Sequence, residues 1–191
     1  MAVDAYMTFT KYDGNALAAE SQVDFSKQKD ELKEASGKFV AGHVFEITDY
    51  NFDIEQTLNI GSASKGAGAG RVTFNPFSFT RKIDQASPIF FKMACSGTPF
   101  KEVLLGLRKA SGGETSGSFF LMYRFVLAAV KTVSWAHDEE SPNETVTFEY
   151  GGMQIFYGIQ KPDGTINQSS IPAGWDRVKN VMNDKPDFHI A

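Results

Sequence analysis

Cysteine, histidine and tryptophan are scarce in this chain of 191 residues, which contains one cysteine, three histidines and two tryptophans. A single cysteine, Cys95, excludes a disulfide within the chain and gives no sign of an oxidising compartment. A zinc site needs three or four ligands that converge on one point, and His43, His137 and His189 have no metal-ligand spacing to one another or to Cys95. The sequence therefore predicts no bound metal and no other cofactor.

Clustered positive charge and long apolar runs are missing as well. Lysine and arginine total 19 against 23 acidic residues, and the net charge of −4 argues against a nucleic-acid partner, since phosphate binding needs a basic surface. The N-terminus lacks the basic and apolar regions of a signal peptide. The most apolar stretch, 119–130, is interrupted by Arg124 and is too short to span a bilayer. We expect no membrane insertion, a cytoplasmic protein at first, and export only by a route without a cleaved signal peptide.

Phenylalanine is abundant, with 17 residues, and it favours the pleated, half-buried surfaces of β-sheets. A chain of this length can bury roughly 70% of its unfolded surface, so it needs no metal or disulfide to hold a core. We predict a mainly β domain over residues 1–164 and a C-terminal tail, 165–191, that packs on the same domain around Trp175.

Apolar and polar residues alternate, with the period of a β-strand, in several segments of the chain. The strand at 118–136 is too long to be flat, so we expect it to bend. Residues 15–38 are polar and charged and predict an excursion on the surface, with a candidate helix at 27–34. The predicted strands are 3–10, 44–60, 71–82 with a kink at Pro76, 100–110, 118–136, 145–150 and 153–160, the last two separated or bulged at Gly151 and Gly152.

One short helix interrupts the strands at 87–94. Ser87 is the predicted N-cap, Pro88 the first helical residue and Gly97 the C-terminal stop. Ile89, Phe90 and Met93 fall at helical spacing and form one apolar face. We expect this face to be buried, and Cys95 at the end of the helix to be a small core residue and not a nucleophile.

The strand at 44–60 has two distinct faces. Its apolar face carries Tyr50, Phe52, Ile54, Leu58 and Ile60. Of these, Tyr50, Phe52 and Ile54 are predicted to point into the core. Its polar face carries Asp49, Asn51, Asp53 and Glu55, and in a monomer this row needs no function beyond contact with solvent.

The glycine-rich segment 61–70 predicts a flexible loop between two strands. It is not a phosphate-binding loop, because Arg71 stands where the motif needs glycine and a strand follows where the motif needs a helix. Ser62 and Lys65 match a nucleophile motif whose partner motifs are absent. No catalytic set emerges elsewhere, so the sequence predicts a protein that is not an enzyme.

A series of short segments follows in a distinctive order and spacing after residue 40. They are Gly70-Arg-Val72, Phe77-Ser-Phe-Thr-Arg-Lys82, Asp84, Ser87-Pro88, Met93-Ala-Cys-Ser-Gly97, Leu107-Arg-Lys-Ala110, Asn143-Glu-Thr-Val-Thr-Phe148, Gln160-Lys-Pro-Asp-Gly164 and Gly174-Trp175. Together they resemble the Hcp family, the tube proteins of bacterial type VI secretion systems. The N-terminal third departs from the commoner family pattern, with a longer charged insert after Ala19-Glu20-Ser21.

The resemblance implies a small β-barrel of two packed antiparallel sheets with one short flanking helix. It also implies hexameric rings that stack into a secreted tube, with a VgrG-like spike, sheath proteins and effector proteins as partners. In such a ring, the residues expected to face the lumen are Asp49, Asn51, Asp53 and Glu55. The residues expected in a ring-stacking loop are Gly61, Ser62, Lys65, Gly66, Gly68 and Gly70.

Two other classes of function stay open. A monomeric β-sandwich that binds a ligand such as carbohydrate would show exposed aromatic side chains around a cleft. An effector enzyme carried on an Hcp-like domain would need a further catalytic domain, for which the 27 residues after Gly164 are too few.

Overall fold

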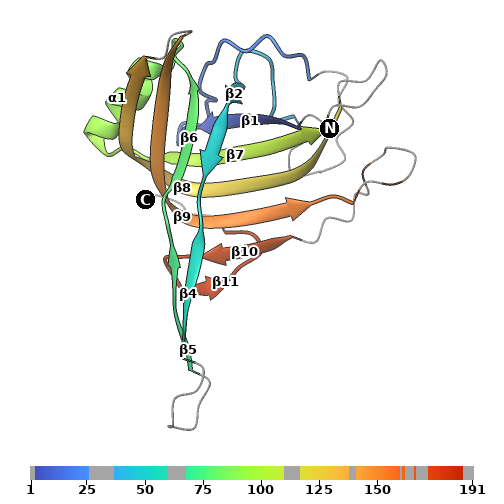
Figure 1. The fold of residues 1–191 in the computed structure, drawn as a ribbon, viewed down its shortest axis with the longest axis vertical. Coiled ribbons are helices and arrows are strands. Elements are labelled where there is room, and N and C mark those ends of the chain that lie inside the picture. Colours follow the sequence, from blue (N-terminus) through green and yellow to red (C-terminus); the bar gives the residue numbers. More distant parts are fainter. Residues whose placement is uncertain are drawn as a thin grey trace.

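A computed structural model of the chain describes residues 3–25, 37–59, 68–109, 117–137, 141–159, 161, 166 and 172–186. Antiparallel strands dominate this part of the chain, together with one helix of ten residues (Figure 1). The elements are β1 Val3–Thr10, β2 Phe45–Ile47, β3 Asp49–Asn51, β4 Ile54–Asn59, β5 Gly68–Phe74, β6 Phe77–Lys82, α1 Ser87–Ser96, β7 Phe100–Lys109, β8 Ser118–His137, β9 Pro142–Tyr157, β10 Ala173–Asp176 and β11 Val181–Met182. The prediction of a mainly β fold with one short helix is confirmed.

The strands close into a barrel. Antiparallel pairing runs from β1 to β7, β8, β9 and then β6. The remaining gap is filled by β2 and β3, which follow each other across Thr48: β2 pairs with β1, and β3 pairs with β6. Closure pairs the strands around the circumference, which removes the exposed edges that an open sheet would present.

Two long strands give the barrel its two walls. The first wall contains β1, β7, the beginning of β8 and the end of β9, and the second contains β3, β6, the end of β8 and the beginning of β9. β8 bends between the walls, where Leu127 adopts a φ of 53° and the register shifts between Val130 and Thr132. The predicted bend is confirmed. The prediction of two strands separated or bulged at Gly151 and Gly152 is wrong, because β9 continues through both glycines without a shift of its register against β8 there.

Phenylalanine rings fill the barrel. Phe77 and Phe79 on β6 alternate with polar residues, are at most 1% exposed, and meet Phe125 and Phe148 from the neighbouring strands. The chain breaks between β5 and β6 at Asn75 and Pro76, where the sequence predicted a kink. After this break the inward residues of β6 are Phe77 and Phe79.

A second apolar cluster lies on the outward face of the first wall. Phe25 and Phe39, from the segment between β1 and β2, pack there against Phe119, Met122 and Phe156 and other core residues. The prediction that residues 15–38 are a surface excursion is therefore wrong in part, because Leu17, Ala19 and Phe25 are buried. The candidate helix at 27–34 lies outside the described residues.

An ion pair between Lys38 and Glu102 joins the segment between β1 and β2 to the barrel. The Lys38 ammonium lies 2.7 Å from Glu102 on β7, and Arg124 on β8 donates to the other oxygen of the same carboxylate at 2.5 Å. Burial alone would raise the pKa of Glu102, but the hydrogen bonds from Lys38 and Arg124 outweigh burial and lower it. The charged carboxylate is thus the form that stabilises the fold.

Acid should therefore weaken the attachment of the insert. A lowered pKa in the folded state gives stability that is present above the unfolded pKa of about 4.3 and is lost as the pH falls through the folded value. We expect the melting temperature of the natural protein to exceed that of Glu102→Gln at pH 7, and the difference to shrink below about pH 4. Thermal melting followed by circular dichroism from pH 7 to pH 3 measures this, and a constant difference would contradict it.

Helix α1 starts differently from the prediction. Its N-cap position is Ala86, without a side-chain cap, so the assignment of Ser87 as N-cap is wrong. The Ser87 hydroxyl instead accepts a hydrogen bond from Arg81 at 3.0 Å. The predicted stop is confirmed, because Gly97 adopts a left-handed φ of 67°. Phe90 is buried as predicted, but Cys95 is exposed, so the prediction of a buried cysteine is wrong.

The predicted strand 44–60 is divided into β2, β3 and β4. Tyr50 and Phe52 pack against the barrel core as expected. β4 then leaves the barrel and pairs with β5 as a two-stranded ribbon (Figure 1). Ile54 and Leu58 are 44% and 60% exposed, because no second layer of the described residues covers them. The prediction that Ile54 points into the core is therefore wrong.

Candidate assembly surfaces

The outward face of the second wall carries two rows of short polar side chains. These residues alternate with core-facing side chains on each strand, so strand geometry turns them all to the same side. The core-facing side chains are Phe77 and Phe79 on β6, Val146 and Phe148 on β9, Tyr50 on β3 and Val133 on β8. Paired positions across β3, β6, β9 and β8 form the rows, which are Asp49, Thr80, Thr145 and Ser134, and Asn51, Ser78, Thr147 and Thr132. We call these eight residues the hydroxyl wall.

Hydrogen bonds join four side chains of the hydroxyl wall in two pairs. The Ser78 and Thr147 hydroxyls lie 2.9 Å apart, and those of Thr80 and Thr145 lie 3.0 Å apart. Asp49 is the one charged member. Such a surface binds water and polar groups through donors and acceptors, and it offers no arrangement for acid–base or nucleophilic chemistry.

The four predicted lumen residues are divided by the structure. Asp49 and Asn51 are exposed on the hydroxyl wall. Asp53 lies between β3 and β4 and accepts a hydrogen bond from the Asn75 side chain at 2.8 Å, and Glu55 lies on the ribbon opposite Thr73. Sequence reasoning missed the hydroxyl residues of β6, β8 and β9, although the alternation of serine or threonine with phenylalanine in 77–80 and 145–148 was a readable signal.

The ribbon of β4 and β5 depends on a glycine. A bulge interrupts its register between Gln56 and Leu58, and the Gln56 side chain donates to the Gly70 carbonyl. A Cβ at Gly70 would collide with the Thr57 carbonyl oxygen, so only glycine allows the strands this close. Gly68 and Gly70 thus lie in β5 and not in the predicted loop, whereas Gly61, Ser62, Lys65 and Gly66 lie outside the described residues.

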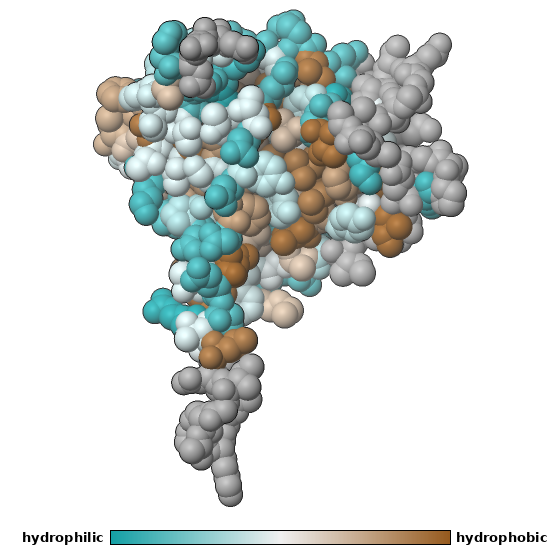
Figure 2. Space-filling model, viewed as in Figure 1, coloured by the Kyte–Doolittle hydropathy of each residue, from teal (hydrophilic) through white to brown (hydrophobic). Residues whose placement is uncertain are grey.

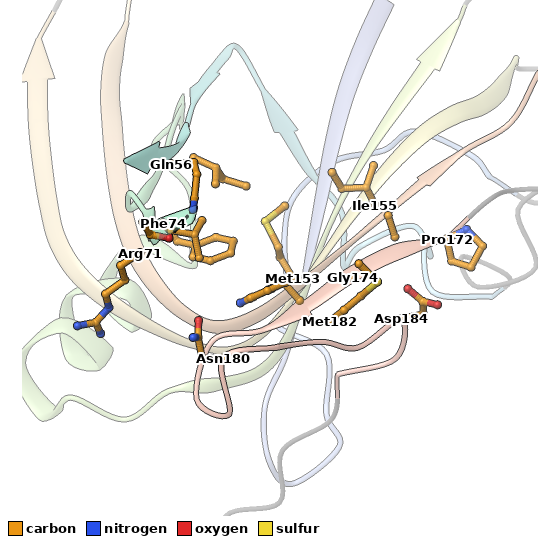
Figure 3. A pocket seen from close by; sticks show the side chains of 15 residues that line it. Gln56, Arg71, Phe74, Met153, Ile155, Pro172, Gly174, Asn180, Met182 and Asp184 are labelled. Atoms are coloured by element: carbon orange, nitrogen blue, oxygen red, sulfur yellow. Dashed lines mark hydrogen bonds between the residues drawn. The ribbon is translucent and has the colours of Figure 1, made fainter. Parts of the chain in front are cut away.

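An open apolar groove separates the ribbon from the C-terminal strands (Figure 3). Its volume is about 730 Å³, with Ile54, Val72 and Phe74 on the ribbon side and Met153, Trp175 and Met182 on the side of β9, β10 and β11. Figure 2 shows hydrophobic side chains gathered beside the root of the ribbon. A surface of this kind usually marks a site of contact with a protein or ligand.

The described residues show no alternative centre of chemistry. No group of three histidine, cysteine, aspartate or glutamate side chains among them could hold a metal ion. His43 contacts the Leu17 carbonyl at 3.3 Å, His137 ends β8, and His189 lies outside the described residues. Over the same part of the chain, no helix has the length and apolar character needed to cross a membrane.

Comparisons with known proteins agree with this architecture. Residues 40–157 match the model of the family described as type VI secretion system effector, Hcp. Protein hcp1 of Pseudomonas aeruginosa is 29% identical over 112 residues, which cover 59% of this chain and 69% of that protein.

Solved structures share the fold at low sequence identity. A type six secretion system protein superposes with a TM-score of 0.73 at 22% identity, over 95% of this chain and 100% of that one. Hcp1 from Salmonella typhimurium gives 0.64 at 22% identity, over 96% and 100% of the two chains. A type VI secretion system effector from Yersinia pestis gives 0.62 at 21% identity, over 91% and 99%. Because the family match spans more than half of the sequence, the chain belongs to the Hcp family of type VI secretion system proteins.

Proposed function

We propose that this chain is a subunit of the secreted inner tube of a type VI secretion system, in which hexameric rings stack and hold effector proteins in their lumen. The observation that carries the proposal is the difference between the two barrel walls. The chain covers the outward face of the first wall with its own insert, whereas the hydroxyl wall stays open. A ring built from such barrels can keep a wet lining inside by turning the hydroxyl wall toward its axis.

The hydroxyl wall suits the lining of a transport channel. Serine, threonine and asparagine keep the surface hydrated and bind through short-lived hydrogen bonds, so a cargo can be held and released without a strong charge match. Only Asp49 and Asn51 of the predicted lumen residues belong to this proposed lining. Asp53 and Glu55 lie nearer the ribbon and are not part of it.

The ribbon and the groove suit contacts between copies of the chain. A closed ring repeats one heterologous interface, in which two different surfaces of the subunit meet. The exposed Ile54 and Leu58 of the ribbon and the exposed Met182 at the groove are apolar surfaces that a second copy would cover. We assign the ribbon to the stacking of rings.

A VgrG-like spike, sheath proteins and effectors remain the further partners that the family implies, with secretion that uses no cleaved signal peptide.

The monomeric binding module is the weaker candidate. The groove contains two aromatic side chains, Phe74 and Trp175, but both are half-buried and their neighbours are mostly apolar. A carbohydrate site needs several convergent polar groups for the sugar hydroxyls. The groove is better suited to apolar protein side chains.

Thiol labelling can test whether the hydroxyl wall lines a lumen. In a Cys95→Ser background, which removes the exposed natural thiol, one variant carries Thr132→Cys on the hydroxyl wall and a matched variant carries Val40→Cys in the segment between β1 and β2. Both positions are exposed in the single subunit. In the assembled protein, Thr132→Cys should react with a small maleimide but much more slowly with a maleimide on a large globular carrier, whereas Val40→Cys should react with both.

The carrier reaction gives the deciding comparison. A large carrier cannot enter a narrow channel, so the contrast between the two variants should vanish when the assembly is dissociated by dilution or mild denaturant. Equal carrier rates at Thr132→Cys and Val40→Cys in an assembled ring would place the hydroxyl wall on the outside and contradict the lumen assignment.

A further inference from the structure

Arg177 follows β10 directly and contacts both β9 and the root of the ribbon. Its Nη1 donates to the Tyr150 carbonyl at 2.6 Å and to Glu149 Oε2 at 3.3 Å, and its Nη2 donates to the Phe74 carbonyl at 3.4 Å. Phe74 is the last residue of the ribbon strand β5, and Tyr150 lies in the barrel wall. One guanidinium thus joins three segments that are far apart in the sequence.

Two aromatic rings also pack against the same guanidinium. Its central carbon lies 5.4 Å from the centre of the Phe74 ring and 4.8 Å from that of Tyr150. The Tyr150 hydroxyl donates to the Asn75 carbonyl at 3.2 Å, next to Phe74. Burial raises the pKa of Tyr150 to about 12, so the hydroxyl keeps its proton and remains a donor at physiological pH.

The ribbon root depends on these contacts for its direction. The two bonds between Asn75 and Asp53, at 3.1 Å and 2.8 Å, join the two sides of the root to each other and not to the barrel. Among the described residues, Arg177 and Tyr150 supply the side-chain hydrogen bonds from the barrel side to residues 74 and 75. Arg177 is itself held by a bond from its backbone N–H to the Gly151 carbonyl at 2.9 Å.

We propose that Arg177, supported by Tyr150, is a positioning residue that fixes the direction of the ribbon and the width of the apolar groove, and that ring stacking requires it. We call the contacts of Arg177 and Tyr150 with residues 74 and 75 the clamp. The claim that ring stacking requires Arg177 rests on the function proposed for the ribbon. The claim that the clamp fixes the ribbon does not, because it concerns a single subunit. The C-terminal segment thereby controls an assembly surface formed by residues about 100 positions earlier in the chain, since Arg177 and Phe74 are separated by 103 positions.

Hydrogen exchange measured by mass spectrometry tests the clamp directly. Arg177→Met removes the guanidinium and its contacts with Glu149, Tyr150 and Phe74 but keeps the backbone bond to Gly151. Arg177→Lys keeps a positive charge for Glu149 but loses the planar fork that reaches two carbonyls. Both should raise exchange in residues 54–58 and 70–74 by about tenfold, a change equivalent to about 1.4 kcal/mol. Exchange in β7 and the number of subunits in a ring should not change, while tube formation seen by electron microscopy should fall. The matched control is Lys131→Met, which removes the other ion pair of Glu149 without touching the ribbon.

The outcomes separate the clamp from its role in assembly. Unchanged ribbon exchange in both Arg177 variants overturns the clamp. Faster ribbon exchange with undiminished stacking overturns the link to assembly. If Arg177→Met does not fold, Tyr150→Phe removes only the bond to Asn75 and should still raise ribbon exchange. A natural protein whose rings never stack contradicts the proposed function, and the exchange result then still decides whether the clamp exists.

Discussion

Phe90→Ala is expected to lower the free energy of unfolding by about 3–5 kcal/mol, a large part of the stability of a domain of this size. The Phe90 side chain is 0% exposed, and its ring lies 5.1 Å from that of Phe9 and 5.9 Å from that of Phe100. Truncation leaves a cavity where α1 meets the barrel, and the surrounding strands cannot collapse into it because their pairing is closed.

Chemical denaturation monitored by circular dichroism measures the loss. The matched control is Phe91→Ala, one position along the same helix, because Phe91 is 53% exposed and its removal opens no cavity. A Phe90→Ala variant as stable as Phe91→Ala would mean that α1 does not pack on the barrel as described.

Arg81→Met is expected to destabilise the protein by about 3–5 kcal/mol, because it leaves a buried carboxylate without its cation. Arg81 is 2% exposed and Glu144 is 0% exposed, with Arg81 Nη2 lying 2.8 Å from Glu144 Oε1. The guanidinium also bonds Asp84 at 2.6 Å and packs over the rings of Phe45 and Phe90. It therefore joins β6, β9 and the start of α1.

The double variant Arg81→Met/Glu144→Leu removes both charges. Comparing it with Arg81→Met separates the lost attraction between Arg81 and Glu144 from the cost of burying the Glu144 carboxylate without a cation. Apolar residues of similar volume can replace a buried ion pair with little loss, so the double variant should be more stable than Arg81→Met alone. Equilibrium unfolding in urea of the two single variants and the double variant completes the cycle. If the loss of unfolding free energy in the double variant equals the sum of the losses in the two single variants, Arg81 and Glu144 do not interact strongly.

The barrel strands could be predicted from the sequence because local patterning and tertiary packing agree there. β1 has the bounds that alternation predicted, and the start of β8 and the kink before Phe77 also match. The family resemblance, confirmed by the match over residues 40–157, supplied the closed architecture and the expectation of a secreted, non-enzymatic structural protein. Alternation alone does not say which strands pair.

The errors lie where distant contacts decide the structure. Ile54 continues the apolar alternation of Tyr50 and Phe52, but the chain leaves the barrel at Asp53, and in the part of the chain that the structure describes nothing buries Ile54 or Leu58. Ser87 has the side chain of a good N-cap, but the buried Arg81 and Glu144 compete for its hydroxyl. Phe25 follows Asp24 in a polar and charged segment, so its burial against the first wall depends on distant residues and cannot be predicted from the local sequence pattern.

The candidate surfaces were predictable only in part for the same reason. Asp49 and Asn51 were found from one strand, whereas the hydroxyl wall needs the register of four strands. The groove needs the ribbon and the C-terminal strands placed side by side, and Arg177 carries no motif that marks it as a link between them.

Native mass spectrometry of the purified natural chain at micromolar concentration tests the central claim most directly, because it counts subunits. A ring-forming tube subunit should give a dominant species of six times the 21.0-kDa chain, with larger multiples where rings stack. A spectrum that contains only the monomer at that concentration would contradict the ring, and with it the assignment of the hydroxyl wall to a lumen.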